Sequence, residues 1–311
     1  MCVVTVSAQL RARAGLLAVS GGAVLWGTTG VAVRIVNERT GLDAVSIGFY
    51  RVLIAAVVVA LVLRRRGFVA ARAALREHPI ALPLSGAGFG AYQALYFVGV
   101  QDVGVSISTL VSLGIAPIAL TAGTAIARRR LPQPSGLAVL GCAVAGLVLV
   151  SVRTDSGVSA PHPVLGVLAS IASGLGYAGI TALSSRMSHQ DPFVLTGVTS
   201  TIGAVVLLPF AAVTGLGMRA DALATFWLGY IGVVPTVLAY WLFYRGLRST
   251  ASEVAGVLTL LEPLTAAVLA AIVVHEQLTA LALIGGALML VAVGTLYLRR
   301  PAPEVADLPP P

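Results

Sequence analysis

Apolar residues in this chain are gathered into blocks of about 18–25 residues with few charges, the length at which a helix crosses the hydrocarbon core of a bilayer. The whole chain of 311 residues shows the same imbalance, with 58% hydrophobic and 10% charged residues. A soluble domain has roughly 45–50% apolar and about 25% charged residues. The composition therefore excludes a disordered chain, a disulfide scaffold and a soluble enzyme with one incidental anchor.

Ten such blocks, each bounded by charge, proline or glycine, predict an all-α integral membrane protein with ten transmembrane helices. They cover approximately residues 14–36, 44–63, 80–100, 103–127, 135–152, 163–184, 193–214, 224–246, 252–274 and 278–298. Only Gln101 and Asp102 separate the third block from the fourth. One continuous helix over both would be about 72 Å long, more than twice the bilayer core, so we expect a hairpin there.

The positive charges indicate how the chain lies in the membrane. All 20 basic residues are arginine, and with both termini inside, 15 of them fall in cytoplasmic segments and 4 in outer segments. Because short cytoplasmic loops are enriched in basic residues, we expect cytoplasmic termini in a multi-pass protein of the plasma membrane, the bacterial inner membrane. The net charge of +8 then reflects topology, and we expect no nucleic acid partner.

The two halves of the chain echo each other. Pro117 and Pro263 lie in similar spans 146 residues apart, and Trp26 and Tyr177 lie in similar settings 151 residues apart. Since each half has an odd number of spans, we expect two inverted five-helix repeats, an architecture typical of secondary transporters that work by alternating access. The predicted parts are a cytoplasmic N-terminus at 1–13, a first repeat at 14–152, an outer loop at 153–162, a second repeat at 163–300 and a cytoplasmic tail at 301–311.

Short motifs in both halves carry a family resemblance. The second half has A-Y-W-L-F-Y-R-G-L at 239–247, L-L-E-P-L at 260–264, H-E-Q-L-T at 275–279 and G-G-A-L-M-L-V-A-V-G at 285–294. The first half has W-G-T-T-G at 26–30, F-Y-R at 49–51 and Pro117. Together, over roughly residues 14–300, these motifs resemble the EamA family, ten-span members of the drug/metabolite transporter superfamily.

The resemblance implies a basket of helices around a central cavity, with cytoplasmic termini. It also implies movement of small metabolites, often amino acids and their derivatives, usually outward. The family often has a Gly-Glu pair at the end of the fourth span, which His275 and Glu276 match in the second half. The first half has Ala127 and three arginines there, so any role of this glutamate is confined to the second half.

Two ionisable side chains lie deep in predicted spans, where a charge is expensive and usually functional. Arg51 lies roughly 10 Å into the second span and Glu262 roughly 15 Å into the ninth. Arg51 is expected to dock a carboxylate, to act as a gate partner, or to hold helices together with Glu262 or a carbonyl as its counter-group. Pro263 bends its helix and frees the carbonyl of Thr259, so Glu262 can change its exposure. Pro117 is the matching predicted kink.

Aromatic side chains with a polar group fall on the spans expected to line the cavity. With Arg51 and Glu262, the predicted substrate-binding residues are Trp26, Tyr92, Gln93, Tyr177 and Tyr240. Tyr92 and Tyr96 share one helix face with Gln93 beside them, and such a wall suits an amphipathic solute. Tryptophan and tyrosine also favour membrane interfaces, which is the alternative explanation for single positions.

Catalytic signatures are lacking in the sequence. The four histidines show no metal-ligand spacing, no P-loop occurs, and the carboxylates form no close pair. We therefore expect no enzyme, no metal and no cofactor, but a secondary active transporter that exports amino acids or derivatives, amines or drugs. Its expected partners are a small-molecule substrate, membrane lipid and a candidate coupling proton, in a monomer or weak homodimer. A membrane-embedded lipid-handling protein or enzyme, and a channel, remain alternatives.

Overall fold

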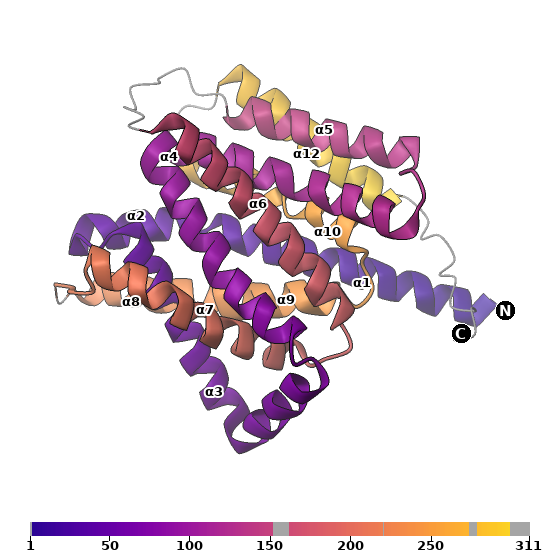
Figure 1. Ribbon diagram of the computed structural model, residues 1–311. Helices are drawn as coiled ribbons and strands as arrows, with labels where there is room; N and C mark the ends of the chain where they lie inside the picture. Colours follow the sequence, from indigo (N-terminus) through magenta and orange to yellow (C-terminus); the bar gives the residue numbers. More distant parts are fainter. Residues whose placement is uncertain (1, 152–161, 220, 274–278, 299–311) are drawn as a thin grey trace.

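The structure of the protein, a computed structural model, describes residues 2–151, 162–219, 221–273 and 279–298, and within these ranges it contains helices and no strand (Figure 1). In chain order the helices are α1 (Cys2–Gly27), α2 (Thr29–Thr40), α3 (Ala44–Glu77), α4 (Ala81–Arg128), α5 (Pro134–Ser151), α6 (Pro163–Arg186), α7 (Pro192–Thr214), α8 (Ala222–Gly232), α9 (Ala239–Gly246), α10 (Ser252–Leu258), α11 (Leu261–Val273) and α12 (Ala280–Leu298). A π-helical segment, η1 (Val233–Leu238), joins α8 to α9.

Helix α4 is too long to cross a membrane once, and it folds back on itself. Gly104 has φ 81° and ψ 162°, angles that glycine adopts without strain and that end a helix. Across this point the hydroxyl of Tyr96 lies 2.7 Å from that of Thr109, although 13 residues of straight helix would separate them by about 20 Å. The predicted hairpin is present, with its turn at Gly104 and not at Gln101 and Asp102, which are helical.

Nine helical stretches in the described ranges are long and apolar enough to cross a membrane. One of the nine is α4, whose hairpin divides it into two spans. The apolar blocks of the sequence thus became membrane-length helices, because a backbone in hydrocarbon must satisfy its own hydrogen bonds.

One predicted boundary was wrong. Helix already begins at Cys2 and continues through α2 to Thr40, where the sequence predicted a span at 14–36. The predicted span at 44–63 is confirmed by the membrane-length stretch Ala44–Arg64; after a break at Arg64, whose φ is 49°, α3 continues to Glu77. The stretch after this break is rich in alanine and arginine, both strong helix formers, so it is helical although it is too charged to enter the membrane.

The two halves of the chain interlock. Helix α3 packs on α7, α4 on α6 and α7, α1 on α9, and α5 on α12, so each main helix pair joins the first half to the second. Figure 1 shows α5 and α12 side by side at one edge of the bundle, while α1, α4, α6 and α9 lie nearer its middle. Residues from both halves therefore meet at the centre.

Glycines let α5 and α12 approach each other closely. A Cβ added at Gly146 would lie 2.6 Å from the carbonyl oxygen of Gly285, and one added at Gly285 would lie 2.5 Å from that of Gly146. Both distances are too short for real atoms, so these positions accept only glycine without a shift of the helices. Small residues at such crossings are the usual means by which membrane helices pack.

We predict opposite effects for alanine at two glycines of α5. Gly146→Ala should lower the free energy of unfolding by about 1–3 kcal/mol, because the methyl group meets α12. Gly141→Ala should raise it by about 0.5–1 kcal/mol, because open space surrounds Gly141 and alanine is the better helix former. Thermal unfolding of the purified proteins in detergent measures both, and a loss of stability in Gly141→Ala would contradict the packing described.

Candidate functional site

Aromatic rings from four helices meet at the centre of the bundle. Trp26 of α1 lies 4.8 Å from Tyr240 and 5.3 Å from Phe243, both of α9, measured between ring centroids. Tyr177 of α6 lies 6.5 Å from Trp26 and 5.6 Å from Tyr92 of α4. With Phe89 of α4, which lies 4.9 Å from Tyr240, these six residues form what we call the aromatic cluster. The structure thus brings together the four aromatic residues predicted to bind substrate, Trp26, Tyr92, Tyr177 and Tyr240.

One hydrogen bond in the aromatic cluster joins the two halves of the chain. The hydroxyl of Tyr92 lies 2.9 Å from the hydroxyl of Tyr240, and either can be the donor. Tyr240 and Trp26 are buried, with 7% and 5% of their surfaces exposed. Phe243 was missed from the sequence, although it lies three residues after Tyr240 and hence on the same face of its helix.

Arg51 is held by Gln93, beside the aromatic cluster. Its Nη2 donates to the side-chain oxygen of Gln93, whose Nε2 donates in turn to the carbonyl oxygen of Phe89 at 3.2 Å. The Nε of Arg51 is buried and has no hydrogen-bond partner in the described structure. Gln93 therefore fixes the guanidinium while leaving one of its donors unused.

Glu262 lies in the first turn of α11, directly after a break in the helix. Its backbone N–H donates to the carbonyl oxygen of Thr259 at 3.0 Å, so the expectation that Pro263 leaves that carbonyl free was wrong. The helix already ends at Leu258, and the turn at Thr259 re-uses the carbonyl. A Cβ added at Gly27 would lie 2.6 Å from the Glu262 carbonyl oxygen, so α1 and α11 touch here.

Arg51 and Glu262 do not form an ion pair, since in the described structure no charged nitrogen of Arg51 lies within 4.0 Å of the Glu262 carboxylate. Arg51 reaches the aromatic cluster through Gln93, and Glu262 lies on α11, which touches α1 at Gly27, next to Trp26. The site therefore holds one positive and one negative group that do not form an ion pair with each other.

Several donors at this site are buried without a partner among the described residues. They are Nε1 of Trp26, Nε of Arg51 and the hydroxyl of Tyr177. Buried polar groups in proteins are nearly always hydrogen-bonded, so each exception needs an explanation. Three unused donors around one cluster are what a site for a ligand with hydrogen-bond acceptors would present.

The two predicted kinks lie in different surroundings. Pro117 is buried in the second arm of α4, where Gly256 of α10 packs so closely that its added Cβ would lie 3.2 Å from the Pro117 Cα. The backbone of α4 keeps helical angles at Pro117. Pro263 instead follows the break between α10 and α11. In the second half, the helix is therefore interrupted between Leu258 and Leu261, before Pro263.

A cavity of about 630 Å³ lies away from the aromatic cluster, at the end of the bundle where α4 is joined to α5 and α9 to α10. Its lining includes Leu16, Thr124, Arg128, Thr250 and Glu253, and none of the predicted substrate-binding residues. At the centre, the described structure places the rings of the aromatic cluster in contact with one another. Sequence reasoning missed Glu253 because a charge beside a span is ordinarily only its boundary.

Comparisons with known proteins agree on one family. The sequence pattern of the EamA-like transporter family matches residues 13–152 and again 164–298. "Uncharacterized transporter YwfM" of Bacillus subtilis (strain 168) is 30% identical over 285 residues, which cover 87% of this chain and 89% of the relative. "Uncharacterized inner membrane transporter YicL" of Salmonella typhimurium (strain LT2) is 25% identical over 272 residues, with 86% and 89% covered.

A solved structure supports the fold. One protein known by its crystal structure is 19% identical to this chain and superimposes with a TM-score of 0.76, over 94% of this chain and 96% of its own. At this identity the similarity speaks for the fold alone. His275 and Glu276 of the predicted motifs lie outside the described residues.

We predict that the Gln93→Leu variant loses stability, because the Arg51 guanidinium would lose its acceptor inside the bundle. The free energy of unfolding should fall by about 1.5–3 kcal/mol, the range for hydrogen bonds to charged groups. Ser85→Ala in the same helix is the matched control. The Ser85 hydroxyl is buried and has no hydrogen-bond partner among the described residues, so its removal leaves no other group without a partner. Equal losses of thermal stability in the two variants would contradict the role of Gln93.

Proposed function

Because the chain belongs to the EamA-like transporter family, we propose that this multi-pass membrane protein is a secondary active transporter that exports amino acids, their derivatives or related amines. The observation that carries the proposal is the set of unused donors at Arg51 and Trp26 among tilted and edge-on aromatic rings, with Glu262 on α11, which packs on α1.

The charges of the site suit a zwitterion. The free Nε of Arg51 would bind a carboxylate, for which guanidinium has the matching geometry. Glu262 would bind an ammonium group, and the faces of Trp26 and Tyr177 would add cation–π and apolar contact. A solute with both charges and an apolar part would satisfy every group, whereas a purely apolar solute would leave the charges buried and unpaired.

Two halves with the same family pattern suit an alternating-access mechanism. Each half contributes five spans, so a repeat in sequence would be inverted across the membrane, with the substrate site at the interface of the halves. Trp26, Arg51 and Tyr92 come from the first half, and Tyr177, Tyr240 and Glu262 from the second. Rocking of one half against the other would part the hydroxyls of Tyr92 and Tyr240 and open the aromatic cluster.

The arginine distribution supports termini in the cytoplasm, and the cavity of about 630 Å³ would then face the cytoplasm. Arg128 and Arg130 line its mouth. Leu16 in its wall lies ten residues before Trp26 on α1, a distance of about 15 Å. We propose that the cavity is the vestibule through which a solute reaches the aromatic cluster from inside the cell.

Glu262 is also the group at which we propose a coupling proton binds. It is a carboxylate beside the break between α10 and α11, so a change in backbone conformation can alter its surroundings. Protonation would remove the negative charge that holds an ammonium group, which couples the release of the solute to the uptake of a proton.

We predict that Glu262→Gln lowers transport tenfold or more, on the order expected for loss of a charged hydrogen bond, without loss of folded protein. Exchange of labelled amino acids across sealed proteoliposomes measures the activity. Glu38→Gln is the control, because Glu38 forms only a surface pair with Arg34 at 2.7 Å. Wild-type exchange in Glu262→Gln, or chemical turnover of the solute without movement across the membrane, would contradict the proposal.

We further predict opposite changes in solute preference for the two charged residues. Arg51→Gln should weaken the binding of carboxylated solutes by about 10–100-fold and leave amines without a carboxylate less affected. Glu262→Gln should weaken the binding of amines and leave carboxylates less affected. Competition of both solute types against labelled exchange measures the preference, and parallel losses for both would indicate a structural role.

A further inference from the structure

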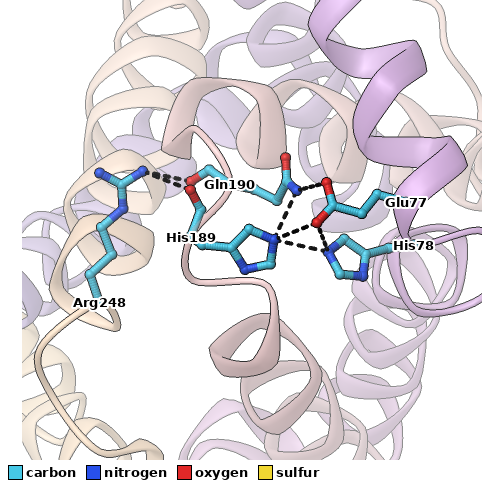
Figure 2. Close-up of polar contacts among 5 residues, drawn as sticks. All are labelled: Glu77, His78, His189, Gln190 and Arg248. Atoms are coloured by element: carbon cyan, nitrogen blue, oxygen red, sulfur yellow. Dashed lines mark hydrogen bonds and ion pairs between the residues drawn. The ribbon is translucent and has the colours of Figure 1, made fainter. Parts of the chain in front are cut away.

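A second cluster of polar side chains lies outside the membrane-spanning segments, at the end of the bundle that we propose to be cytoplasmic. Glu77 ends α3 and His78 follows it, while His189 and Gln190 lie in the turn between α6 and α7. Figure 2 shows the side chains of all four turned toward one another. Glu77 and His189 are 112 residues apart in the sequence and belong to different halves.

Three potential metal ligands converge in this cluster. The Nε2 of His189 lies 2.9 Å from Oε1 of Glu77 and 3.4 Å from Nε2 of His78. The Nε2 of His78 lies 3.7 Å from the same carboxylate oxygen. In a tetrahedral zinc site with ligand distances of about 2.0–2.1 Å, neighbouring ligand atoms are about 3.3–3.4 Å apart. The three separations bracket this value, so small side-chain movements would complete such a site.

Hydrogen bonds alone leave this arrangement poorly satisfied. The Nε2 of His189 has three polar neighbours, because the Gln190 amide nitrogen also lies 3.0 Å away. If the Nε2 of His189 carries a proton, it can donate to Glu77, but its N–H then lies against the N–H group of Gln190. If this Nε2 carries no proton, its lone pair lies against a lone pair of the Glu77 carboxylate. A cation at the centre would accept the lone pairs of both histidines and the carboxylate together.

The surroundings prepare the three ligands. Gln190 donates to the other oxygen of Glu77, Oε2, at 2.7 Å and leaves Oε1 free to face the histidines. Half of the Glu77 and His189 side-chain surfaces are exposed, at 54% and 55%, so an ion from water can reach them.

Arg248 fixes the position of the turn that carries His189. It donates from Nε to the carbonyl oxygen of Ser188 at 2.9 Å and from Nη2 to that of Gln190 at 2.7 Å. Figure 2 shows its guanidinium on the far side of this turn, directed at the carbonyl oxygens and away from the two imidazoles. Arg248 is therefore a positioning residue for the cluster, and its charge is already engaged.

We propose that Glu77 Oε1, His78 Nε2 and His189 Nε2 bind a divalent transition-metal ion, with the two-imidazole, one-carboxylate set favouring zinc. Water from the exposed side would supply the fourth ligand, as in other three-ligand zinc sites. Binding releases any proton on the two ligating nitrogens to solvent and involves no other chemical change.

The ion would join the helix end of α3 in the first half to the α6–α7 turn in the second. If, as proposed above, the two halves separate at alternate ends during transport, an ion across this end holds it closed. Zinc would then inhibit transport. This second part rests on the proposed function, whereas binding of the ion does not.

Isothermal titration of the purified, untagged protein with zinc tests the binding. We expect one ion per chain. Removal of a residue that only supports the ligands lowers metal affinity by about 10–100-fold, and we expect a larger loss in both His78→Ala and His189→Ala. His162→Ala is the control, because His162 is an exposed histidine before α6. Magnesium should give no binding at the same concentration, since it prefers oxygen ligands.

Unchanged zinc affinity in His189→Ala would overturn the site, as would the absence of one-to-one binding in the wild type. Thermal unfolding shows whether each variant is folded, and Glu77→Gln provides a milder variant that keeps the hydrogen bond from Gln190 within reach. Both measurements use the whole protein in detergent and need no transport activity.

Exchange in proteoliposomes tests the second part. Zinc should slow exchange in the wild type and leave His78→Ala unaffected. Zinc binding without any effect on exchange would overturn the closure while the site stands. If Glu262→Gln abolishes exchange but still binds zinc, the transport site and the metal site are independent of each other.

Discussion

The hydrocarbon of a bilayer offers a backbone no hydrogen-bond partners, and every break in a spanning helix must therefore be satisfied by the protein itself. Three breaks of the bundle contain a threonine whose hydroxyl donates to a nearby carbonyl oxygen: Thr28 to Leu25 at 2.7 Å, Thr236 to Ile231 at 2.8 Å and Thr259 to Gly256 at 2.9 Å. The hydroxyl of Tyr230 also donates to that of Thr28 at 2.9 Å, which ties the first break to the helix before η1.

These breaks surround the candidate site. Trp26 lies two residues before Thr28, Tyr240 four residues after Thr236, and Glu262 three residues after Thr259. The backbone is thus most easily deformed where the rings and the carboxylate lie. At the first and third of these breaks, backbone hydrogen bonds such as Thr28 N–H to Leu25 at 3.2 Å and Glu262 N–H to Thr259 at 3.0 Å supplement the threonine hydroxyl.

Much of the fold follows from lengths and charges in the sequence, and the hairpin of α4 follows from arithmetic alone, since its residues as one helix would overrun a bilayer. The aromatic cluster could be predicted in part, because Trp26 and Tyr240 lie inside spans together with polar neighbours. Contacts between segments far apart in the chain could not be predicted from the sequence. Nothing near His78 in the sequence points to His189, because the turn that carries it is brought there by the packing of α6 on α4.

Interlocking of the two halves has a consequence for how the protein is made. Helices α1, α3, α4 and α5 find their main partners in α9, α7, α6 and α12, all of which follow later in the chain. At synthesis rates of about 5–20 residues per second, the first half waits on the order of 10–30 s in the membrane before its partners arrive. During that interval glycines such as Gly146, which packs on Gly285, lack their partners from the second half. The contacts between the two halves therefore form only after the first half has entered the membrane. Until the chain is complete, lipid or the insertion machinery must cover the surfaces of the first half that later contact the second half.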